Sequence, residues 1–409
     1  MEICFTEKEQ AFYDEVDEFL RTELPADWPS RSVIWPGDYA PSGYGTEENY
    51  EIAFQFIAKL VDKKWLTISW PEEYSGKQYT HMEQSIFDER MTYYRAPMVD
   101  SLGVGIVGPM LLRIGTPEQQ AEWIPRIATA EIRCWLAYSE PNAGSDLAAI
   151  ETTAIKDGDE YVINGQKVWS SGAHISQFGW LIARTDPSAG KHQGVSLFML
   201  DNNLPGITIR PIENIIGESH FNEVFFDNVR IPARNLIGEE NKGFYHLMSA
   251  LDFERVALVG IGGFRRMYEE LLEYARTTKL DGKILGKQPD VRHKLVDIGT
   301  RVEIAYQYVW QIAAMIDQGL NPTVESSVLK VVSTELARDM SEVGMDILGP
   351  YSQLTKPSDR TPLRALVSRG YLNAISATIG AGTSEIQRNI IAQRGLGMPR
   401  YKGKGGQKS

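Results

Sequence analysis

The segment Leu251-Asp252-Phe253-Glu254-Arg255 decides how the C-terminal half of this chain is interpreted. Apolar residues recur every three or four positions around it, which predicts one helix over roughly 244–270 with an apolar face. Glu254 falls on that face, where a buried carboxylate is costly unless it is paired, hydrated or used in chemistry. Burial would raise its pKa toward the range of a general base. The alternative is a carboxylate at the edge of the face that pairs with Arg255 or with another helix. The apolar positions are Leu247, Leu251, Leu258 and Ile261.

Composition limits the class of protein. The chain has 409 residues and a net charge of −12, which argues against nucleic acid and anionic membranes as partners. Hydrophobic residues make up 43%, as in a globular protein of two or three domains. Cys4 and Cys134 are too few for a disulfide framework and indicate a reducing compartment. No stretch approaches the ~18 apolar residues of a membrane-spanning helix, and the N-terminus lacks a signal pattern. We therefore expect a cytoplasmic prokaryotic protein without membrane insertion.

The hydrophobic periodicity changes twice along the chain. Residues 1–130 predict an N-terminal helical domain, with helices that begin after Thr6 and Thr116 and others near 47–65 and 81–95. A Pro- and Gly-rich stretch at 25–45 predicts a loop. Residues 131–238 predict a β-domain, and 239–400 a C-terminal helical bundle before a tail at 401–409. The fold class expected is mainly α with an inserted β-domain.

Turn signals divide the β-domain into short strands. Asp157-Gly158 and Asn164-Gly165 each predict a two-residue hairpin. The predicted strands cover 152–155, 161–163, 167–170, 179–183, 195–200, 207–210 and 223–226. The bundle is expected to contain helices over 244–278, 289–318, 322–348, 364–379 and 383–394.

A first motif, Tyr138-Ser139-Glu140-Pro141-Asn142-Ala143-Gly144-Ser145-Asp146, lies where a strand enters a loop. Gly144 permits close backbone approach, and Ser139 and Ser145 offer hydroxyl and N–H groups. Such a loop can bind the edge of a heteroaromatic ring or a phosphate. The alternative is an ordinary Pro/Gly turn.

A second motif is Asn164-Gly165-Gln166-Lys167-Val168-Trp169-Ser170-Ser171-Gly172. Trp169 could offer a flat face to a ligand ring, and Ser171 could bond to the edge of that ring. The alternative is that Trp169 is a core residue of the β-domain.

A third motif is Ile379-Gly380-Ala381-Gly382-Thr383-Ser384-Glu385-Ile386-Gln387-Arg388-Asn389. Here a Gly-rich turn precedes Thr383 as N-cap, which places free N–H groups at a helix start. The alternative is a plain helix cap between two helices of the bundle.

In this order and at these separations, the three motifs resemble those of the acyl-CoA dehydrogenase family over nearly the whole chain. The resemblance implies an N-terminal helical domain, a β-barrel-like middle domain and a C-terminal bundle. It also implies an FAD-dependent enzyme that converts an acyl-CoA thioester to the 2-enoyl-CoA. A carboxylate removes the α-proton, hydride passes to flavin N5, and an electron-transfer flavoprotein then accepts the electrons. A catalytically silent subunit of a heteromer and a flavin oxidase or monooxygenase on the same fold are the alternatives.

The same resemblance implies roles for individual residues. The flavin would be contacted by the three motifs, with Trp169 packed on it and Ser171 at its ring edge. Asp252, Arg255, Gly382 and Ser145 would lie near the acyl-CoA. The residues implied in cofactor binding are Tyr138, Ser139, Gly144, Ser145, Trp169, Ser170, Ser171, Thr383, Ser384 and Glu385.

The position of the base departs from the commoner family pattern. Many members carry a Glu immediately before the Gly-Thr of the third motif, where this chain has Ala381. A minority class, which includes isovaleryl-CoA dehydrogenase, carries the base in a Leu-Asp-x-Glu-Arg helix segment, and Glu254 occupies that position here. The absence of a carboxylate at Ala381 and the presence of Glu254 in the helix segment together favour Glu254 as the base. Asp100 is the alternative, because some relatives that act on cyclic acyl-CoAs use an Asp of the N-terminal domain.

A second departure concerns assembly. Family homotetramers hold the FAD tail of a neighbouring subunit with an Arg-x-Gln-Phe-Gly segment and a Gln-x-x-Gly-Gly segment. These positions are 278–282 and 346–350 here, and they carry Asp281, Asp346 and Pro350. Two carboxylates have the wrong charge for a pyrophosphate, and proline lacks a backbone donor. We therefore expect a hetero-oligomer with a second subunit of the same family, as in the larger subunits of pimeloyl-CoA and steroid side-chain dehydrogenases. A homo-oligomer with a remodelled adenosine site is the alternative.

Overall fold

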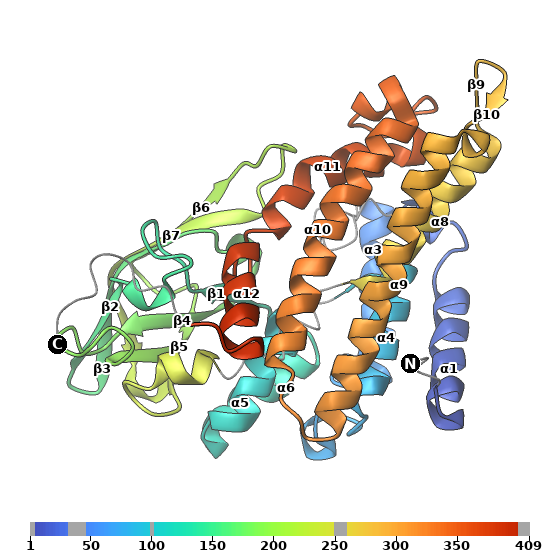
Figure 1. Cartoon of the computed structure of the whole chain (residues 1–409). Coiled ribbons are helices and arrows are strands. Elements are labelled where there is room, and N and C mark those ends of the chain that lie inside the picture. Colours follow the sequence, from blue (N-terminus) through green and yellow to red (C-terminus); the bar gives the residue numbers. More distant parts are fainter. Residues whose placement is uncertain (1–4, 32–45, 99–101, 249–259, 400–409) are drawn as a thin grey trace.

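The chain folds as helices, then a sheet, then helices again, as the sequence predicts (Figure 1). The computed structural model describes residues 5–31, 46–98, 102–248 and 260–399. The sheet lies on one side of the molecule (Figure 1). On the other side, the long helices α8 (Ile261–Thr277), α9 (Pro289–Asp317) and α10 (Thr323–Leu348) stand beside α4 (His81–Tyr93) and α1 (Glu7–Glu23). The expected fold class, mainly α with an inserted β-domain, is confirmed. None of the helices in these ranges combines the length and apolar character that crossing a lipid bilayer requires.

The N-terminal helices begin at caps that the sequence already shows. Thr6 accepts the N–H of Glu9, whose side chain bonds back to the Thr6 backbone, and Thr116 caps its helix in the same way. The predicted loop at 25–45 is partly wrong, because a short helix forms at its start, and the sequence also did not predict α5. The helices are α1 (Glu7–Glu23), α2 (Trp28–Arg31), α3 (Glu47–Asp62), α4 (His81–Tyr93), α5 (Gly108–Ile114) and α6 (Pro117–Ala128), with a 3-10 turn at Glu72–Tyr74 and a π-turn at Gly103–Val107.

The middle of the chain forms a sheet with the strand order β6-β7-β3-β2-β4-β5-β8, and β1 pairs in parallel with β4. Asp157 pairs with Glu160 across a tight turn in which Gly158 has φ +65°, so the first predicted hairpin is confirmed. The strands are β1 (Cys134–Ala137), β2 (Thr153–Asp157), β3 (Glu160–Lys167), β4 (Phe178–Arg184), β5 (Val195–Asp201), β6 (Ile207–Ile212), β7 (Phe221–Pro232) and β8 (Leu236–Ile237), with 3-10 turns at Leu147–Ala149, Ala173–Ile175 and Ala233–Asn235.

The second predicted hairpin, at Asn164-Gly165, is wrong. Strand β3 runs through both residues, and its pairing with β7 shifts register between Ile163 and Gly165. Gly165 has φ +147°, and a Cβ there would lie 2.6 Å from Thr152 Oγ1. The glycine therefore serves a bulge and a close backbone approach rather than a turn.

The C-terminal helices match the predicted segments except at the first. Residues 243–248 are helical, but Gly260 has φ +58° and is the N-cap of α8, so a single continuous helix across this position is wrong. Leu247 and Ile261, expected on one face, pack into different cores. The helices are α8 (Ile261–Thr277), α9 (Pro289–Asp317), α10 (Thr323–Leu348), α11 (Leu366–Ala377) and α12 (Ser384–Ile390), with a hairpin of β9 (Lys279–Leu280) and β10 (Lys283–Ile284), 3-10 turns at Leu285–Lys287, Gly349–Gln353 and Pro362–Ala365, and a π-turn at Ile391–Gly395.

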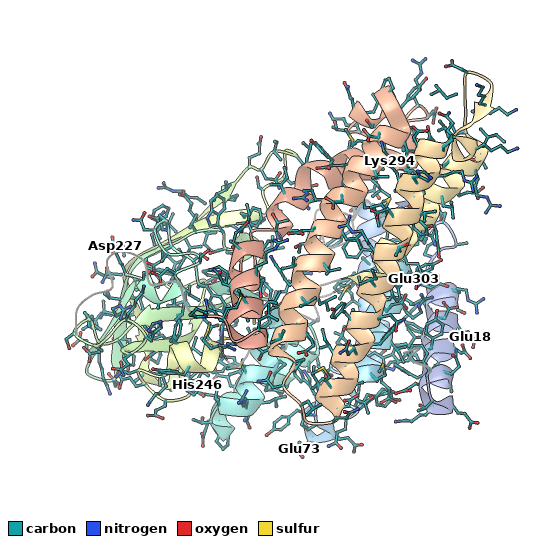
Figure 2. All side chains as sticks on the ribbon, viewed as in Figure 1. Glu18, Glu73, Asp227, His246, Lys294 and Glu303 are labelled. Atoms are coloured by element: carbon teal, nitrogen blue, oxygen red, sulfur yellow. The ribbon has the colours of Figure 1, made fainter. Side chains whose placement is uncertain are left out.

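Hydrophobic burial joins segments that are far apart in the chain. One core combines N-terminal residues such as Trp65 with C-terminal residues such as Phe264. A second core packs Trp123 of α6 against Trp180 of the sheet. Charged side chains such as Glu303 and Lys294 lie on the outer surface of the helical part (Figure 2). The two helical regions thus form one body around a shared core.

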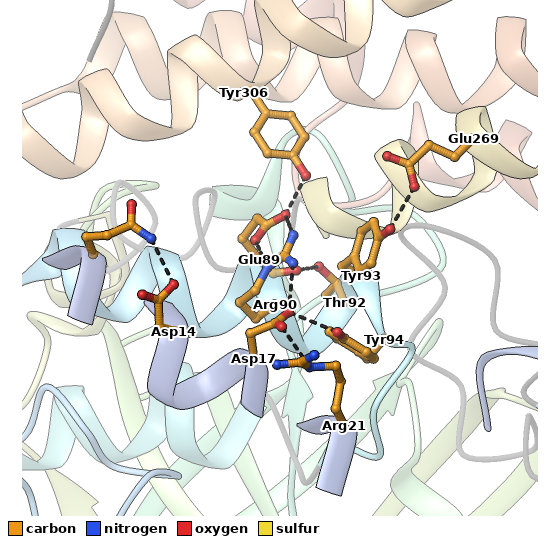
Figure 3. Close-up of polar contacts among 11 residues, drawn as sticks. Asp14, Asp17, Arg21, Glu89, Arg90, Thr92, Tyr93, Tyr94, Glu269 and Tyr306 are labelled. Atoms are coloured by element: carbon orange, nitrogen blue, oxygen red, sulfur yellow. Dashed lines mark hydrogen bonds and ion pairs between the residues drawn. The ribbon is translucent and has the colours of Figure 1, made fainter. Parts of the chain in front are cut away.

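A buried polar network crosses the helical core (Figure 3). Glu89 is 1% exposed, forms an ion pair with Arg90 and accepts the hydroxyl of Tyr306 at 2.6 Å. Arg90 also contacts Asp17 at 3.2 Å, and Asp17 accepts the hydroxyl of Tyr94 at 2.9 Å. The network therefore connects α1, α4 and α9 with satisfied polar groups.

Candidate functional site

The first motif forms a compact loop directly after β1. Glu140 and Ala143 exchange two backbone hydrogen bonds, each with an N–O distance of 3.0 Å. Gly144 and Ser145 are exposed, and a Cβ at Gly144 would meet no atom within 4 Å. The loop is thus a tight turn at its base, as the alternative interpretation expected, but its tip remains open to a ligand.

Trp169, in the second motif, is not a core residue. It is 59% exposed, and its backbone adopts φ +60°, a left-handed conformation that is unfavourable for a bulky side chain. Its ring meets Phe221 edge-to-face with centroids 6.1 Å apart. Exposure of a tryptophan on a strained backbone is typical of a functional position, and it overturns the interpretation of Trp169 as part of the β-domain core.

Hydrogen bonds on both sides hold Trp169 in this conformation. The Val168 N–H donates to Ser139 O at 2.9 Å, which joins the second motif to the first. On the other side, the Ser170 N–H donates to Asn222 O at 3.1 Å, and Asn222 Nδ2 donates back to Ser170 O at 2.8 Å. The neighbours of Trp169 are therefore fixed while its ring faces outward.

The serines of the motifs divide into buried and accessible ones. Ser170 is 1% exposed and Ser384 is 4% exposed, and within the described ranges the hydroxyl of each is buried without a hydrogen-bond partner. Ser171 is partly exposed. Unsatisfied buried hydroxyls are uncommon in native proteins, so these two fit a site whose ligand supplies polar atoms. Both belong to the residues implied in cofactor binding.

Beneath the first two motifs lies a buried ion pair. Lys167 is fully buried, and its Nζ lies 2.8 Å from Glu140 Oε1 and 3.0 Å from Tyr138 O. The other carboxylate oxygen of Glu140 accepts the N–H of Glu151 at 2.6 Å, while Oε1 also accepts that of Thr152 at 3.0 Å. Both residues belong to the sequence motifs, but the sequence did not predict a role for either. No local pattern indicates their burial, because Glu140 stands in a polar loop and Lys167 follows Asn164-Gly165-Gln166.

The environment shifts the pKa values of this pair. Burial lowers the pKa of Lys167 to about 8, although the carboxylate of Glu140 opposes that shift. For Glu140, burial is the largest influence and would raise the pKa, but the charge of Lys167 and the N–H donors together hold the pKa below its usual value. Glu140 is therefore ionised at neutral pH.

The third motif forms the turn into α12. Thr383 is the N-cap and accepts the N–H of Ile386 at 3.1 Å. Gln387 Nε2 donates to Ala381 O at 3.2 Å, and a Cβ at Gly382, which has φ +84°, would lie 2.6 Å from that nitrogen. Ala381 itself is exposed with φ +52°. The turn therefore needs the glycine, and its alanine offers no group that can accept a proton.

Glu385 follows on the exposed side of the same turn. Its pKa is lowered first by its own backbone N–H and then by the Thr383 side chain. Arg388 of α12 pairs with Glu335 of α10 at 2.7 Å, which fixes the helix against the bundle. Four further predicted residues, Asp100, Asp252, Glu254 and Arg255, lie outside the described residues.

Taken together, the described residues fit a flavin. An exposed indole, two orphaned serine hydroxyls and an open loop tip are the groups that a planar heterocycle with polar edges requires. The helical, β and helical architecture and these groups are those expected of a flavin-dependent oxidoreductase.

Comparison with known proteins identifies the family. Three family models match successive parts of the chain: the acyl-CoA dehydrogenase N-terminal domain at residues 6–131, the middle domain at 136–229 and the C-terminal domain at 241–396. The acyl-CoA dehydrogenase FadE26 of Mycobacterium tuberculosis is 32% identical over 98% of this chain and 99% of its own length. The chain belongs to the acyl-CoA dehydrogenase family, whose members are FAD-dependent oxidoreductases.

Solved structures agree with this assignment. The ChsE4-ChsE5 complex from Mycobacterium tuberculosis superposes with a TM-score of 0.85 at 32% identity, covering 98% of this chain and 100% of that chain. The Tcur3481-Tcur3483 steroid ACAD superposes with a TM-score of 0.86 at 28% identity, again covering 98% of this chain and 100% of the other.

Proposed function

We propose that this chain is the base-bearing subunit of a two-subunit acyl-CoA dehydrogenase, with Glu254 as the general base. The exposed, strained Trp169 is the observation that carries the flavin site. A tryptophan whose neighbours hold its side chain outward offers an apolar plane to a ligand. Covering that plane with a flavin ring would remove apolar surface from water, which favours binding.

The motif residues surround that plane in the proposed site. Bound FAD supplies the hydride acceptor for the reaction. Trp169 would stack on the ring system, and Ser170 and Ser171 would hydrogen-bond to its polar edge. Tyr138, Ser139, Gly144 and Ser145 line the flavin and thioester region, while Thr383, Ser384 and Glu385 contact the cofactor from the bundle. Asp252, Arg255, Gly382 and Ser145 contact the acyl-CoA.

The proposed base removes the proton next to the thioester carbonyl. Ala381 stands where many relatives carry a Glu, so the turn before α12 cannot accept this proton. Glu254 is the carboxylate in the position used by the minority class, and Asp100 is the alternative. Backbone N–H groups near the thioester oxygen would stabilise the negative charge that develops there.

The proposed partners are an acyl-CoA, an electron-transfer flavoprotein and a second family subunit. The structure named as a ChsE4-ChsE5 complex supports a pairing of two unlike chains, and the protein named a steroid ACAD supports a bulky acyl group. In this chain, the exposed tip of the β9–β10 hairpin carries Asp281, which disfavours binding of a pyrophosphate from another subunit.

The flavin site is tested by replacing Trp169 in the purified native oligomer. Trp169→Ala should raise the dissociation constant for FAD about tenfold, which corresponds to about 1.4 kcal/mol of binding free energy. Trp169→Phe should raise the dissociation constant less, because an aromatic ring remains. Tyr50→Ala is the control, because Tyr50 is similarly exposed, at 56%, but lies on α3. An unchanged FAD affinity in Trp169→Ala would place the flavin elsewhere.

A further inference from the structure

We propose that the buried Lys167–Glu140 ion pair is a positioning device that sets the first motif against Trp169 and thereby sets the affinity for flavin. The inference rests on the proposed flavin site and adds two residues to it. Both side chains are buried beneath the residues that would contact the cofactor, so they act through those residues rather than on the cofactor itself.

The pair connects three segments at one point. Lys167 lies near the end of β3, two residues before Trp169, and its ammonium group bonds to Tyr138 O and Glu140 in the first motif. Glu140 also accepts the N–H groups of Glu151 and Thr152, which precede β2. Because these segments are far apart in sequence, the geometry of the two motifs depends on this contact.

Backbone contacts beside the ion pair join the same segments. The Val168 N–H donates to Ser139 O at 2.9 Å, directly beside the ion pair. Thr152 abuts Gly165 at the bulge of β3, where any Cβ would collide with it. The bulge, the ion pair and this hydrogen bond therefore fix the residue at which β3 ends. They also fix the direction of the backbone at Trp169, two residues later.

Stability alone does not account for such a pair. Removing two charges from water is costly, and replacing a buried ion pair with well-packed apolar groups is often neutral or stabilising. An ion pair with directional hydrogen bonds can specify one relative position of the groups it joins, as buried polar groups do in some proteins. Here those groups are the two flavin-contacting motifs.

The test removes both charges together, so that neither is left buried alone. In the double variant Lys167→Met/Glu140→Gln, the single amide oxygen of the new glutamine can still accept one of the Glu151 and Thr152 N–H groups, which bond to different oxygens of Glu140. We expect the apoprotein to fold with a melting temperature close to that of the parent. The dissociation constant for FAD should rise at least tenfold because the position of the first motif relative to Trp169 is no longer fixed.

A matched control separates positioning from general stability. Glu89→Gln/Arg90→Met neutralises another buried ion pair, which lies in α4 within the helical core. This variant should lower the melting temperature of the apoprotein and leave FAD affinity within a factor of two of the parent. An FAD affinity that follows the melting temperature in both variants would overturn the inference.

Two further outcomes decide the remaining cases. If the double variant does not fold, Glu140→Asp replaces it, because it keeps both charges and withdraws the carboxylate by one methylene, with an expected rise of at least threefold in the FAD dissociation constant. An affinity within a factor of two of the parent in a folded variant overturns the positioning role. If Trp169→Ala weakens FAD binding but the pair variants do not, only this inference fails. If Trp169→Ala has no effect either, the flavin site itself fails.

Discussion

Trp169 shows how a single residue can be kept in an unfavourable conformation. A left-handed backbone at a bulky residue costs about 1–3 kcal/mol, and it persists only where the surroundings enforce it. Val168 and Ser170, on either side, are each tied by backbone hydrogen bonds to other segments. The strain is therefore balanced by contacts that have little to do with the indole, which leaves the ring free for a ligand.

Glu254 carries the chemical step of the proposal. We expect the Glu254→Gln variant to bind FAD and the acyl-CoA as the parent does, because the amide group has nearly the same size as the carboxylate. Flavin bleaching by substrate should slow by about 10²- to 10⁴-fold, the usual contribution of a general base. Stopped-flow absorbance measures this with the acyl-CoA that bleaches the parent fastest in a panel of branched, cyclic, dicarboxylic and steroid-linked thioesters.

Asp100→Asn is the matched variant for this prediction. It should bleach at the parental rate if Glu254 is the base. The reverse pattern, with full activity in Glu254→Gln and none in Asp100→Asn, would move the role to the N-terminal domain.

His220 gives a prediction for pH dependence. Burial lowers its pKa below the usual 6.5, the charge of His174 acts in the same direction, and Glu218 opposes both. The unfolded chain therefore takes up this proton first as the pH falls, and the folded state loses stability below about pH 6.5. In His220→Gln, the decrease in unfolding free energy between about pH 7 and pH 5 should be smaller than in the parent.

Urea denaturation at a series of pH values measures this difference. His246 has a pKa lowered mainly by burial, so its contribution has the same sign. A double variant of both histidines should reduce the loss of unfolding free energy at acidic pH further. If the unfolding free energy falls equally with pH in the parent and the variants, other groups control stability between about pH 7 and pH 5.

At the scale of elements, α4 and α8 cross with almost no space between them. A Cβ at Gly262 would lie 1.9 Å from Glu89 O and 2.7 Å from Tyr93 N, both of which are backbone atoms. Neither atom can move without displacing α4, so Gly262→Ala should force the helices apart. We expect a loss of about 3 kcal/mol of unfolding free energy, the upper range for overpacking.

Chemical denaturation of Gly262→Ala tests this crossing. Gly105→Ala is the control, because a Cβ at Gly105 meets no atom within 4 Å and its φ is not in the left-handed range. That change should be neutral or stabilising by up to about 1 kcal/mol. Equal effects at the two positions would contradict the close-crossing argument.

Local signals in the sequence predicted most elements, and distant contacts explain where they failed. The caps at Thr6 and Thr116 act within one helical turn, so the sequence alone shows them. Asn164-Gly165 looks like a turn, but Thr152 requires a glycine there for close approach. The left-handed Gly260 is also set by its surroundings. Conversely, Asp281-Gly282 forms a hairpin turn that its Asp-Gly signal indicates but that is absent from the predicted elements.

The candidate site divides in the same way. The candidate residues near Trp169 in the chain could be selected from the sequence, because the motifs consist of residue types and spacings. They did not show that the indole is exposed, since this depends on the hydrogen bonds of its neighbours. Nor did they indicate the contact between Lys167 and Glu140, which lie 27 positions apart in the chain.

At the scale of the molecule, the three sequence regions are not independent units. The N- and C-terminal helices share one core, in which Trp65 and Phe264 both take part. The connection between β6 and β7 is joined to α11 by an ion pair between Glu218 and Arg369. Either helical region alone would expose its half of the shared core, so binding studies need the full chain.

The assembly of the molecule yields the last prediction. At the positions where family homotetramers hold the FAD tail of a neighbour, Asp281 lies at the exposed hairpin tip, and Asp346 is partly neutralised by Lys294 at 2.7 Å. Within the described residues Asp281 has no ion pair, so its charge disfavours a pyrophosphate at this position. Expressed alone, the chain should bind well below one FAD per subunit, and co-expression with a second family subunit should restore stoichiometric flavin.

A charge-only variant tests the physical reason for that deficit. Asparagine tolerates the φ of +50° at Asp281, so Asp281→Asn removes the charge without new backbone strain. In any homo-oligomer that the chain forms, this variant should retain more FAD after gel filtration than the parent does. Asp290→Asn, at the start of α9, is the control and should not change retention. A stable, fully flavinylated homotetramer of the parent chain would rule out the heteromer, because it would show that the remodelled segments bind the FAD tail without a second kind of subunit.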